Sequence, residues 1–117
     1  LNKANPPGRK VSEFGTRDMY RLARFYAFTM RDEDAGKVYE ELINDWWKDK
    51  DREVPDDDKW VGMAMYYYAE MLYNSLHRAQ AIENWQTFLD YFEDNPQMDQ
   101  DLIQSARNRI RGYKGGH

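Results

Sequence analysis

The chain of 117 residues contains no cysteine and only two histidines. Without cysteine it can form neither disulfides nor cysteine-based metal sites, and a cysteine nucleophile is excluded. No apolar run approaches the roughly 20 residues that a membrane-spanning helix needs, and no signal peptide is recognisable. The chain begins at Leu1 rather than Met. We therefore expect a piece or a mature form of a larger protein, from which a targeting segment could have been removed.

The patterns that carry catalysis or metal binding are also missing. There is no glycine-rich phosphate loop and no histidine pair at helical spacing, and His77 stands alone at an expected turn. Acid–base or nucleophilic catalysis needs side chains that activate one another. The run Asp56–Asp58 lacks the alternating ligands around a glycine that hard cations prefer, so it is better interpreted as a helix N-terminus. We expect a protein that is not an enzyme and that has no cofactor and no metal.

Charge is distributed unevenly along a chain whose net charge is −4. Residues 1–31 hold seven Lys or Arg and two acids, residues 32–58 hold twelve acids and four bases, and residues 101–117 hold four bases and one acid. Such segregation favours docking to a charged partner. Solvated helix faces that neutralise one another within the fold would produce the same pattern.

Hydrophobic spacing predicts helices throughout and no strand. Residues 1–15 are rich in Pro and Gly and should be extended. Helical periodicity then marks one hairpin at about 16–47, a second at about 59–96 that ends at Pro96, and a last helix at about 98–113. Residues 114–117 are interpreted as a tail that could belong to a tag. The sequence thus predicts one all-α domain over residues 16–113.

The two hairpins are related to each other by a shift of 46 residues. At this shift the hairpins align without a gap, and four pairs are identical: Met19 with Met65, Tyr20 with Tyr66, Ala23 with Ala69, and Ala35 with Ala81. The other apolar positions also correspond, among them Tyr39 with Trp85 and Leu42 with Phe88. So many coincidences in one register indicate an internal repeat.

The repeated hairpin resembles the tetratricopeptide repeat (TPR), a helix–turn–helix unit of about 34 residues. The residues that carry the resemblance are Met19, Leu22, Ala23, Tyr26, Ala35, Tyr39 and Leu42 in the first unit and Met65, Tyr68, Ala69, Leu72, Ala81, Trp85 and Phe88 in the second. The ending "AI..W..FLDYF.DNP" looks most like the TPR-like repeats of bacterial envelope-assembly lipoproteins and of the Tol–Pal-associated coordinator. The hairpin turns depart from the family because they lack its usual Gly.

This resemblance implies a right-handed α-α superhelix made of two hairpins and a C-terminal capping helix. It also implies a scaffold or adaptor that binds another protein on the concave surface formed by the first helix of each hairpin. It favours the bacterial periplasm or cell envelope and leaves the cytoplasm open. The family's partner-binding positions fall here on Arg17, Tyr20, Arg24, Phe28, Tyr66, Glu70, Tyr73 and Asn74.

This mixture of cationic and aromatic side chains predicts a partner segment with acidic residues beside an apolar anchor. Trp47 and Tyr67 fall off the main stripes and are assigned to the opposite face. Three alternatives stay open. The cations Arg17 and Arg24 could instead neutralise the acidic segment 32–58, the hairpins could mediate self-association within a larger repeat protein, or the basic and aromatic residues could bind single-stranded nucleic acid. Nucleic acid is the least favoured, because most aromatics fall on core positions.

Overall fold

The computed structural model describes the backbone of residues 15–48 and 55–115, and the side chains of residues 15–48 and 59–113. Over these residues the chain is all-helical and has no strand, as the spacing predicted. The five helices are α1 (Thr16–Phe28), α2 (Asp32–Lys48), α3 (Pro55–Asn74), α4 (Arg78–Phe92) and α5 (Gln100–Gly115). Most of the expected N-terminal segment, the connector 49–54 and the tail side chains lie outside the described residues.

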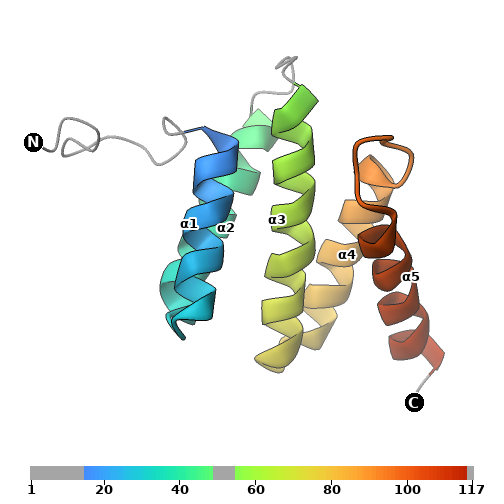
Figure 1. The fold of residues 1–117 in the computed structure, drawn as a ribbon. Coiled ribbons are helices and arrows are strands. Elements are labelled where there is room, and N and C mark those ends of the chain that lie inside the picture. The colour runs from blue at the N-terminus through green and yellow to red at the C-terminus, as the bar shows by residue number, and fades with distance from the viewer. Residues whose placement is uncertain (1–14, 49–54, 116–117) are drawn as a thin grey trace, which may run out of the picture.

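The helices form two antiparallel hairpins and a fifth helix. α1 packs against α2, and α3 packs against α4. The second hairpin contacts both helices of the first through α3, and α5 packs against α4. In Figure 1, α1 and α3 stand side by side at the front, with α2 behind α1 and α4 behind α3. The first helices of the two hairpins therefore share one face of the molecule.

The turns of the two hairpins have the same geometry, 46 residues apart. Met30 and Leu76 have positive φ angles of 64° and 69°. The amide of Arg31 donates to the carbonyl of Tyr26 at 2.8 Å, and the amide of His77 donates to the carbonyl of Leu72 at 2.9 Å. Each turn is thus a Schellman motif, in which a left-handed residue ends the helix. Glycine usually takes this position, and a bulky side chain there costs roughly 1–2 kcal/mol.

The core uses the same positions in both hairpins. Ala23, Ala35, Ala69 and Ala81 are all fully buried, so the helices approach closely at the small residues that the register picked out. The larger members of the repeat are also buried, among them Met19, Met65, Tyr39, Trp85, Leu42 and Phe88. Burying each such side chain contributes about 1.5–3 kcal/mol.

Three consecutive tyrosines of α3 point to three different neighbours, because each residue turns a helix by about 100°. The hydroxyl of Tyr66 lies 2.6 Å from the Oγ of Ser105 on α5. The ring of Tyr67 lies under the guanidinium of Arg24 on α1. The hydroxyl of Tyr68 donates a hydrogen bond to the Glu40 carboxylate on α2. α3 is therefore the helix on which the other elements assemble.

The loop before α5 lies directly against α3 at Gly62. A Cβ atom at this position would lie 2.3 Å from the Cε of Met98 and 3.1 Å from ring carbons of Phe92. Met98 is buried there, as are Ile103, Ala106 and Ile110 of α5. The absence of a side chain at Gly62 lets the loop and α5 cover the second hairpin.

Candidate partner-binding surface

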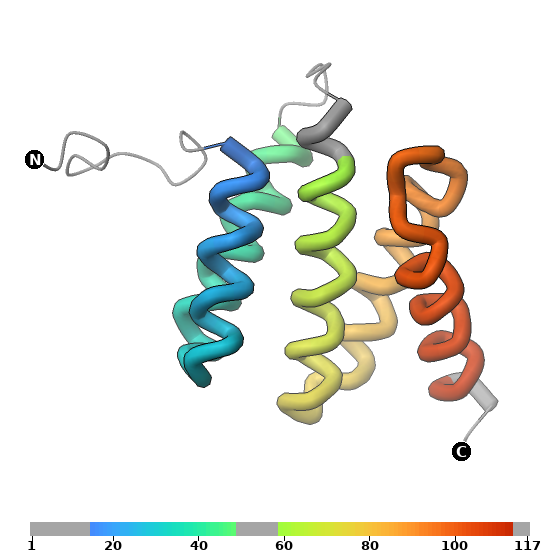
Figure 2. The backbone as a smooth tube through the Cα atoms, in the orientation of Figure 1, coloured from blue at the N-terminus to red at the C-terminus, as the bar shows by residue number. Residues whose placement is uncertain are grey.

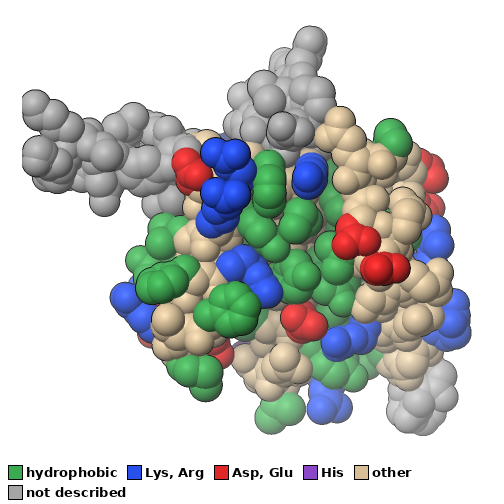
Figure 3. All heavy atoms as spheres, in the orientation of Figure 1, with side chains coloured by type: hydrophobic (Ala, Val, Ile, Leu, Met, Phe, Trp, Pro, Cys, Tyr) green, Lys and Arg blue, Asp and Glu red, His purple; other side chains and the backbone are tan. Residues whose placement is uncertain are grey.

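A row of arginines runs along the outer face of α1. Arg17, Arg21 and Arg24 follow one another at spacings of four and three residues, so they project from one side of the helix, and Phe28 continues the row at its end. Figure 3 shows Lys and Arg side chains on this face beside hydrophobic side chains that occupy its middle. Among the described residues, Arg17 pairs with its neighbour Asp18, with 3.9 Å between Nε and Oδ1. Within the described part of the chain, Arg21 and Arg24 form no ion pair.

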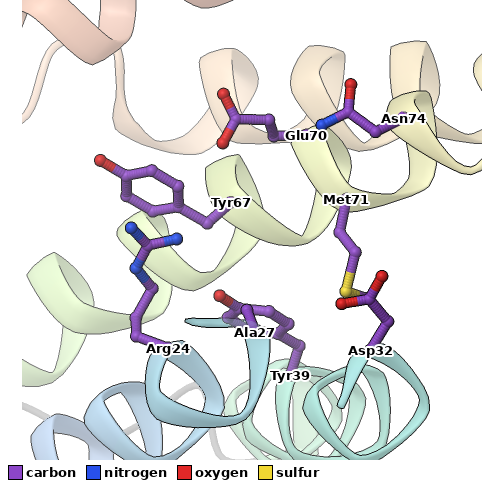
Figure 4. A pocket seen from close by; sticks show the side chains of 8 residues that line it. All are labelled: Arg24, Ala27, Asp32, Tyr39, Tyr67, Glu70, Met71 and Asn74. Carbon is purple, nitrogen blue, oxygen red and sulfur yellow. The ribbon is translucent and has the colours of Figure 1, made fainter. Parts of the chain in front are cut away.

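A small hollow of about 170 Å³ opens between this row and α3. Figure 4 shows side chains from α1, from the start and middle of α2 and from α3 converging on it. The lining residues are Arg24, Ala27, Asp32, Tyr39, Tyr67, Glu70, Met71 and Asn74. The hollow is therefore formed by residues of both hairpins.

The guanidinium of Arg24 is held in place by aromatic rings. Its Cζ lies 3.9 Å from the centroid of the Tyr67 ring and 5.2 Å from that of Phe28. Such cation–π contacts stabilise by about 0.5–2 kcal/mol, and they leave the edge of the guanidinium available for hydrogen bonds. Arg24 is thus positioned before any ligand arrives, which lowers the entropy cost of binding.

Tyr39 is buried beside the same hollow. The residue is only 1% exposed, and its hydroxyl oxygen is itself buried and forms no well-aligned hydrogen bond among the described residues. Burial raises the pKa of Tyr39, an effect opposed in part by the guanidinium of Arg24, which lies within reach of the hydroxyl and carries a positive charge. Burial also raises the pKa of Tyr67 and takes that of Tyr20 to about 12. These phenols are therefore neutral at physiological pH and can donate O–H hydrogen bonds.

The opposite side of the hollow carries acidic and amide groups. The Glu70 carboxylate is paired with Arg109 of α5, with 3.4 Å between Oε2 and Nη2. Asp32 and Asn74 are exposed, and Asp32 forms no ion pair within the described residues. The hollow is therefore cationic at Arg24 and anionic at Asp32, with Tyr39 buried beside it.

The predicted site residues do not all lie on this surface. Arg24, Glu70 and Asn74 line the hollow, while Arg17 and Phe28 are exposed along α1. Tyr20 is buried at the edge of the core, with its ring 5.4 Å from Trp60. These six residues therefore lie on or beside the face that α1 and α3 share.

Tyr66 and Tyr73 require correction. Tyr66 is only 4% exposed, and its hydroxyl faces Ser105 of α5, so a partner cannot reach it on this surface. Tyr73 is half-buried against Trp85, and the cations Arg78 and Arg109 lie over its ring at 4.9 Å and 5.5 Å. Both belong to the contacts between α3, α4 and α5.

The assignment of Tyr67 to the opposite face is wrong. Its ring packs against Arg24 and lines the hollow with Glu70 and Asn74. The signal was present in the spacing, because residues 67, 70 and 74 lie at i, i+3 and i+7 on one helical stripe. Arg21 was missed as a residue of this surface, and Tyr39 was missed as a buried residue beside the hollow. The spacing of Arg21 from Arg17 predicts its position, whereas no sequence pattern shows that Tyr39 lies beside Arg24.

No group of three or more Asp, Glu, His or Cys that could hold a metal ion occurs within residues 15–48 and 59–113. His77 is exposed at the second turn, and the side chains of Asp56–Asp58 lie outside the described set. None of the described helices is long and apolar enough to cross a membrane.

This chain matches no family model, no curated protein and no solved structure. The resemblance to the TPR family therefore rests on the residues themselves. The function proposed below therefore rests on the geometry of the face that α1 and α3 share, which we call the α1–α3 face.

Proposed function

We propose that this chain is a protein–protein interaction module with a TPR-like superhelical arrangement, and that it binds a partner segment along the α1–α3 face. The segment carries an acidic side chain that docks at Arg24, next to an apolar anchor. The observation that supports this best is the position of Arg24: aromatic rings hold its guanidinium at a hollow lined by both hairpins, and it forms no ion pair within the described residues.

A carboxylate fits Arg24, because it accepts two hydrogen bonds from one edge of a guanidinium. The guanidinium lies at a hollow between the hairpins, where charge-assisted hydrogen bonds contribute more than they do in bulk water.

The apolar anchor has its own place beside this site. Ala27 and Met71 line the hollow, and Phe28 is exposed at the end of the arginine row. Met is flexible and polarisable, so it can fit apolar side chains of different shapes. The partner's apolar residue therefore lies within a few residues of its acidic one.

The contacts within residues 32–48 do not support the neutralisation alternative, and the acids of 49–58 lie outside the described side chains. Arg17 lies next to Asp18, and Arg24 forms no ion pair in the described part of the chain. Within residues 32–48, Asp34 pairs with Arg31 at 2.6 Å. Among the described residues, Arg21 and Arg24 thus keep their charge for an external group.

The arginine row also has the form of a phosphate-binding stripe beside aromatic rings, as in single-strand nucleic-acid binders. Asp32 and Glu70 line the far side of the hollow. They would repel the repeated charges of a phosphate backbone more than a single carboxylate that docks at Arg24. A gel-shift assay with mixed oligonucleotides at low salt separates the two cases. A shift that weakens steeply with salt supports nucleic acid, whereas no shift supports the protein segment.

The proposal is tested by selecting binders from a displayed peptide library. The wild-type chain is the bait, and Arg24→Glu is used for counter-selection. We expect the selected peptides to share an acidic residue near an apolar one. Arg24→Glu and Tyr67→Ala should each weaken binding at least about tenfold, or 1.4 kcal/mol, without loss of helical circular dichroism.

Arg111→Glu is the matched control, because Arg111 is an exposed arginine of α5 whose side chain bonds only to Asn108. It makes the same charge change away from the α1–α3 face, so affinity should stay the same. Peptides that bind Arg24→Glu as tightly as wild type would contradict the proposal.

A further inference from the structure

The end of the molecule that carries both hairpin turns is unusually apolar. The described residues include five exposed large hydrophobic side chains, and four of them lie in or next to these turns: Phe25, Phe28, Met30 and Leu76. Met30 is 85% exposed and Leu76 is 76% exposed. Figure 2 shows the two turns next to each other at the lower end of the tube. We call Phe28, Met30 and Leu76 the turn patch.

The fold itself gives no reason for bulky side chains at these two positions. Met30 and Leu76 both have positive φ angles, a conformation that glycine adopts with less strain. Their side chains also leave apolar surface in water. Both effects disfavour the isolated chain, and strained residues of this kind tend to occur where a surface has a role.

The uncompensated charges around the two turns have opposite signs. In the first turn Arg31 is paired with Asp34, which leaves the acids Asp32 and Glu33, and the second turn is followed by Arg78. All three are exposed first-turn residues of their helices, and helical side chains lean toward the helix N-terminus. They therefore project past the helix end, beside the turn patch. No ion pair involves them within the described residues, and Arg78 only stacks over Tyr73.

We propose that the turn patch binds a second copy of this chain. A two-fold axis at this end places turn 29–31 of one protomer against turn 75–77 of its partner, and the reverse contact follows by symmetry. Met30 then meets the partner subunit's Leu76, and Glu33 meets the partner subunit's Arg78. The opposite charges select this pairing over contact between two like turns.

Charge complementarity also decides between occupants. An anionic lipid surface would be repelled by Asp32 and Glu33 next to Met30. A second copy supplies the cation Arg78 opposite the two acids and the apolar Leu76 opposite Met30 and Phe28. The contact area is small, so the dimer should be weak and concentration-dependent.

The first test is sedimentation velocity over a concentration series up to about 1 mM. The wild-type chain should shift from one chain toward two as concentration rises. The double variant Met30→Gly, Leu76→Gly should dimerise at least about tenfold more weakly. Glycine relieves the positive φ angles, so the melting temperature should hold or rise, which separates loss of contact from loss of fold.

Tyr91→Ala is the control for this variant. It removes the fifth exposed hydrophobic residue, which lies at the far end of α4, so it should leave dimerisation unchanged. A wild-type chain that stays monomeric throughout would overturn the proposal. Equal association by the glycine variant would overturn it too.

Charge exchange tests the pairing itself. Arg78→Glu and Glu33→Lys should each weaken dimerisation, since each puts like charges opposite one another. A mixture of the two variants should form a heterodimer, because both contacts are then complementary. A mixture that associates no better than either variant alone would overturn the proposed pairing of the turns.

Discussion

The two hairpins share one backbone plan but differ in what lies in front of the repeated aromatic. In the first hairpin this is the hollow beside Tyr39, which we call the open groove. In the second it is the place beside Trp85 that α5 covers, which we call the closed groove. Tyr39 and Trp85 occupy the same place in the repeat. Both are fully buried, and both keep a polar atom without a hydrogen-bond partner. In front of Trp85, α5 supplies Arg109, whose Cζ lies 5.0 Å from the ring centroid and whose Nη2 pairs with Glu70. In front of Tyr39, the hollow stays open.

The difference shows how the fold pairs a cation at such a groove. In the second hairpin, Arg109 stacks on aromatic rings and forms an ion pair with Glu70 of the same chain. In the first hairpin, Arg24 stacks in the same way on Tyr67 but forms no ion pair with a carboxylate among the described residues. The internal pair of Arg109 and Glu70 is thus a model for the external pair that we propose for Arg24.

The largest expected effect comes from removing the helix that closes the second groove. Deleting residues 97–117 uncovers Tyr66 and Trp85 and removes the buried Ile103, Ala106 and Ile110. Because each large buried side chain contributes about 1.5–3 kcal/mol, the melting temperature should fall by more than about 10 °C, or the chain should aggregate. A truncated chain that melts as a monomer at the wild-type temperature would show that α5 does not stabilise the hairpins.

The second effect concerns the aromatic at the centre of the covered hairpin. Trp85→Ala leaves a cavity among Tyr66, Tyr73 and Phe88 and should cost about 3–5 kcal/mol in urea unfolding. Tyr91→Ala, at a half-exposed position of the same helix, removes edge contacts with Trp46 and Trp47 and should cost about 1–2 kcal/mol. Equal losses in the two variants would contradict the burial of Trp85.

These two predictions depend on features that the sequence already revealed. The 46-residue register placed Ala23, Ala35, Ala69 and Ala81 in the core and identified Trp85 as a core aromatic, because helical spacing reports which face is buried. The register did not reveal what covers that face. The contact of Arg109 with Glu70 depends on how α5 docks, and Tyr66 was lost from the site for the same reason. The position of Arg24 beside the buried hydroxyl of Tyr39 depends on how α1 packs against α2, which no local pattern records.

A matched pair of arginine variants compares the closed and open grooves directly. Arg109→Ala removes an ion pair and the stacking over Trp85 and Tyr73, and should cost about 1–2 kcal/mol. Arg24→Ala removes the stacking on Tyr67 and Phe28 and the contact with the Tyr39 hydroxyl, but no ion pair among the described residues, and should cost about 1 kcal/mol or less. Chemical unfolding of both variants measures the difference. Equal costs would mean that the two grooves are equivalent in the absence of a partner.

The smallest effect is expected from Tyr39→Phe at neutral pH. Removing an unpartnered buried hydroxyl should leave the free energy of unfolding unchanged or raise it by up to about 1 kcal/mol. The same change should leave binding of the selected acidic peptides nearly unchanged, because the hydroxyl oxygen is buried. A clear loss of stability would show that the hydroxyl has a partner within the fold.

Alkaline pH extends this test. The pKa of Tyr39 is raised by burial, so the folded state holds its proton more tightly than the unfolded state. The resulting stability is fully present below the unfolded pKa near 10, and it is lost as pH rises through the folded pKa. Tyr39→Phe should therefore lose less stability above pH 10 than the wild type, measured by urea unfolding at a series of pH values.

The three consecutive tyrosines of α3 can also serve as spectroscopic reporters, because each contacts a different part of the molecule. Fluorotyrosine placed singly at positions 66, 67 and 68 would give three fluorine resonances from one helix turn. The signal at 66 reports on α5 through Ser105, and the signal at 67 reports on Arg24 and the open groove. The signal at 68 reports on the contact with Glu40 inside the first hairpin. A ligand in the open groove should move the resonance at 67, while those at 66 and 68 serve as built-in references for an unchanged scaffold.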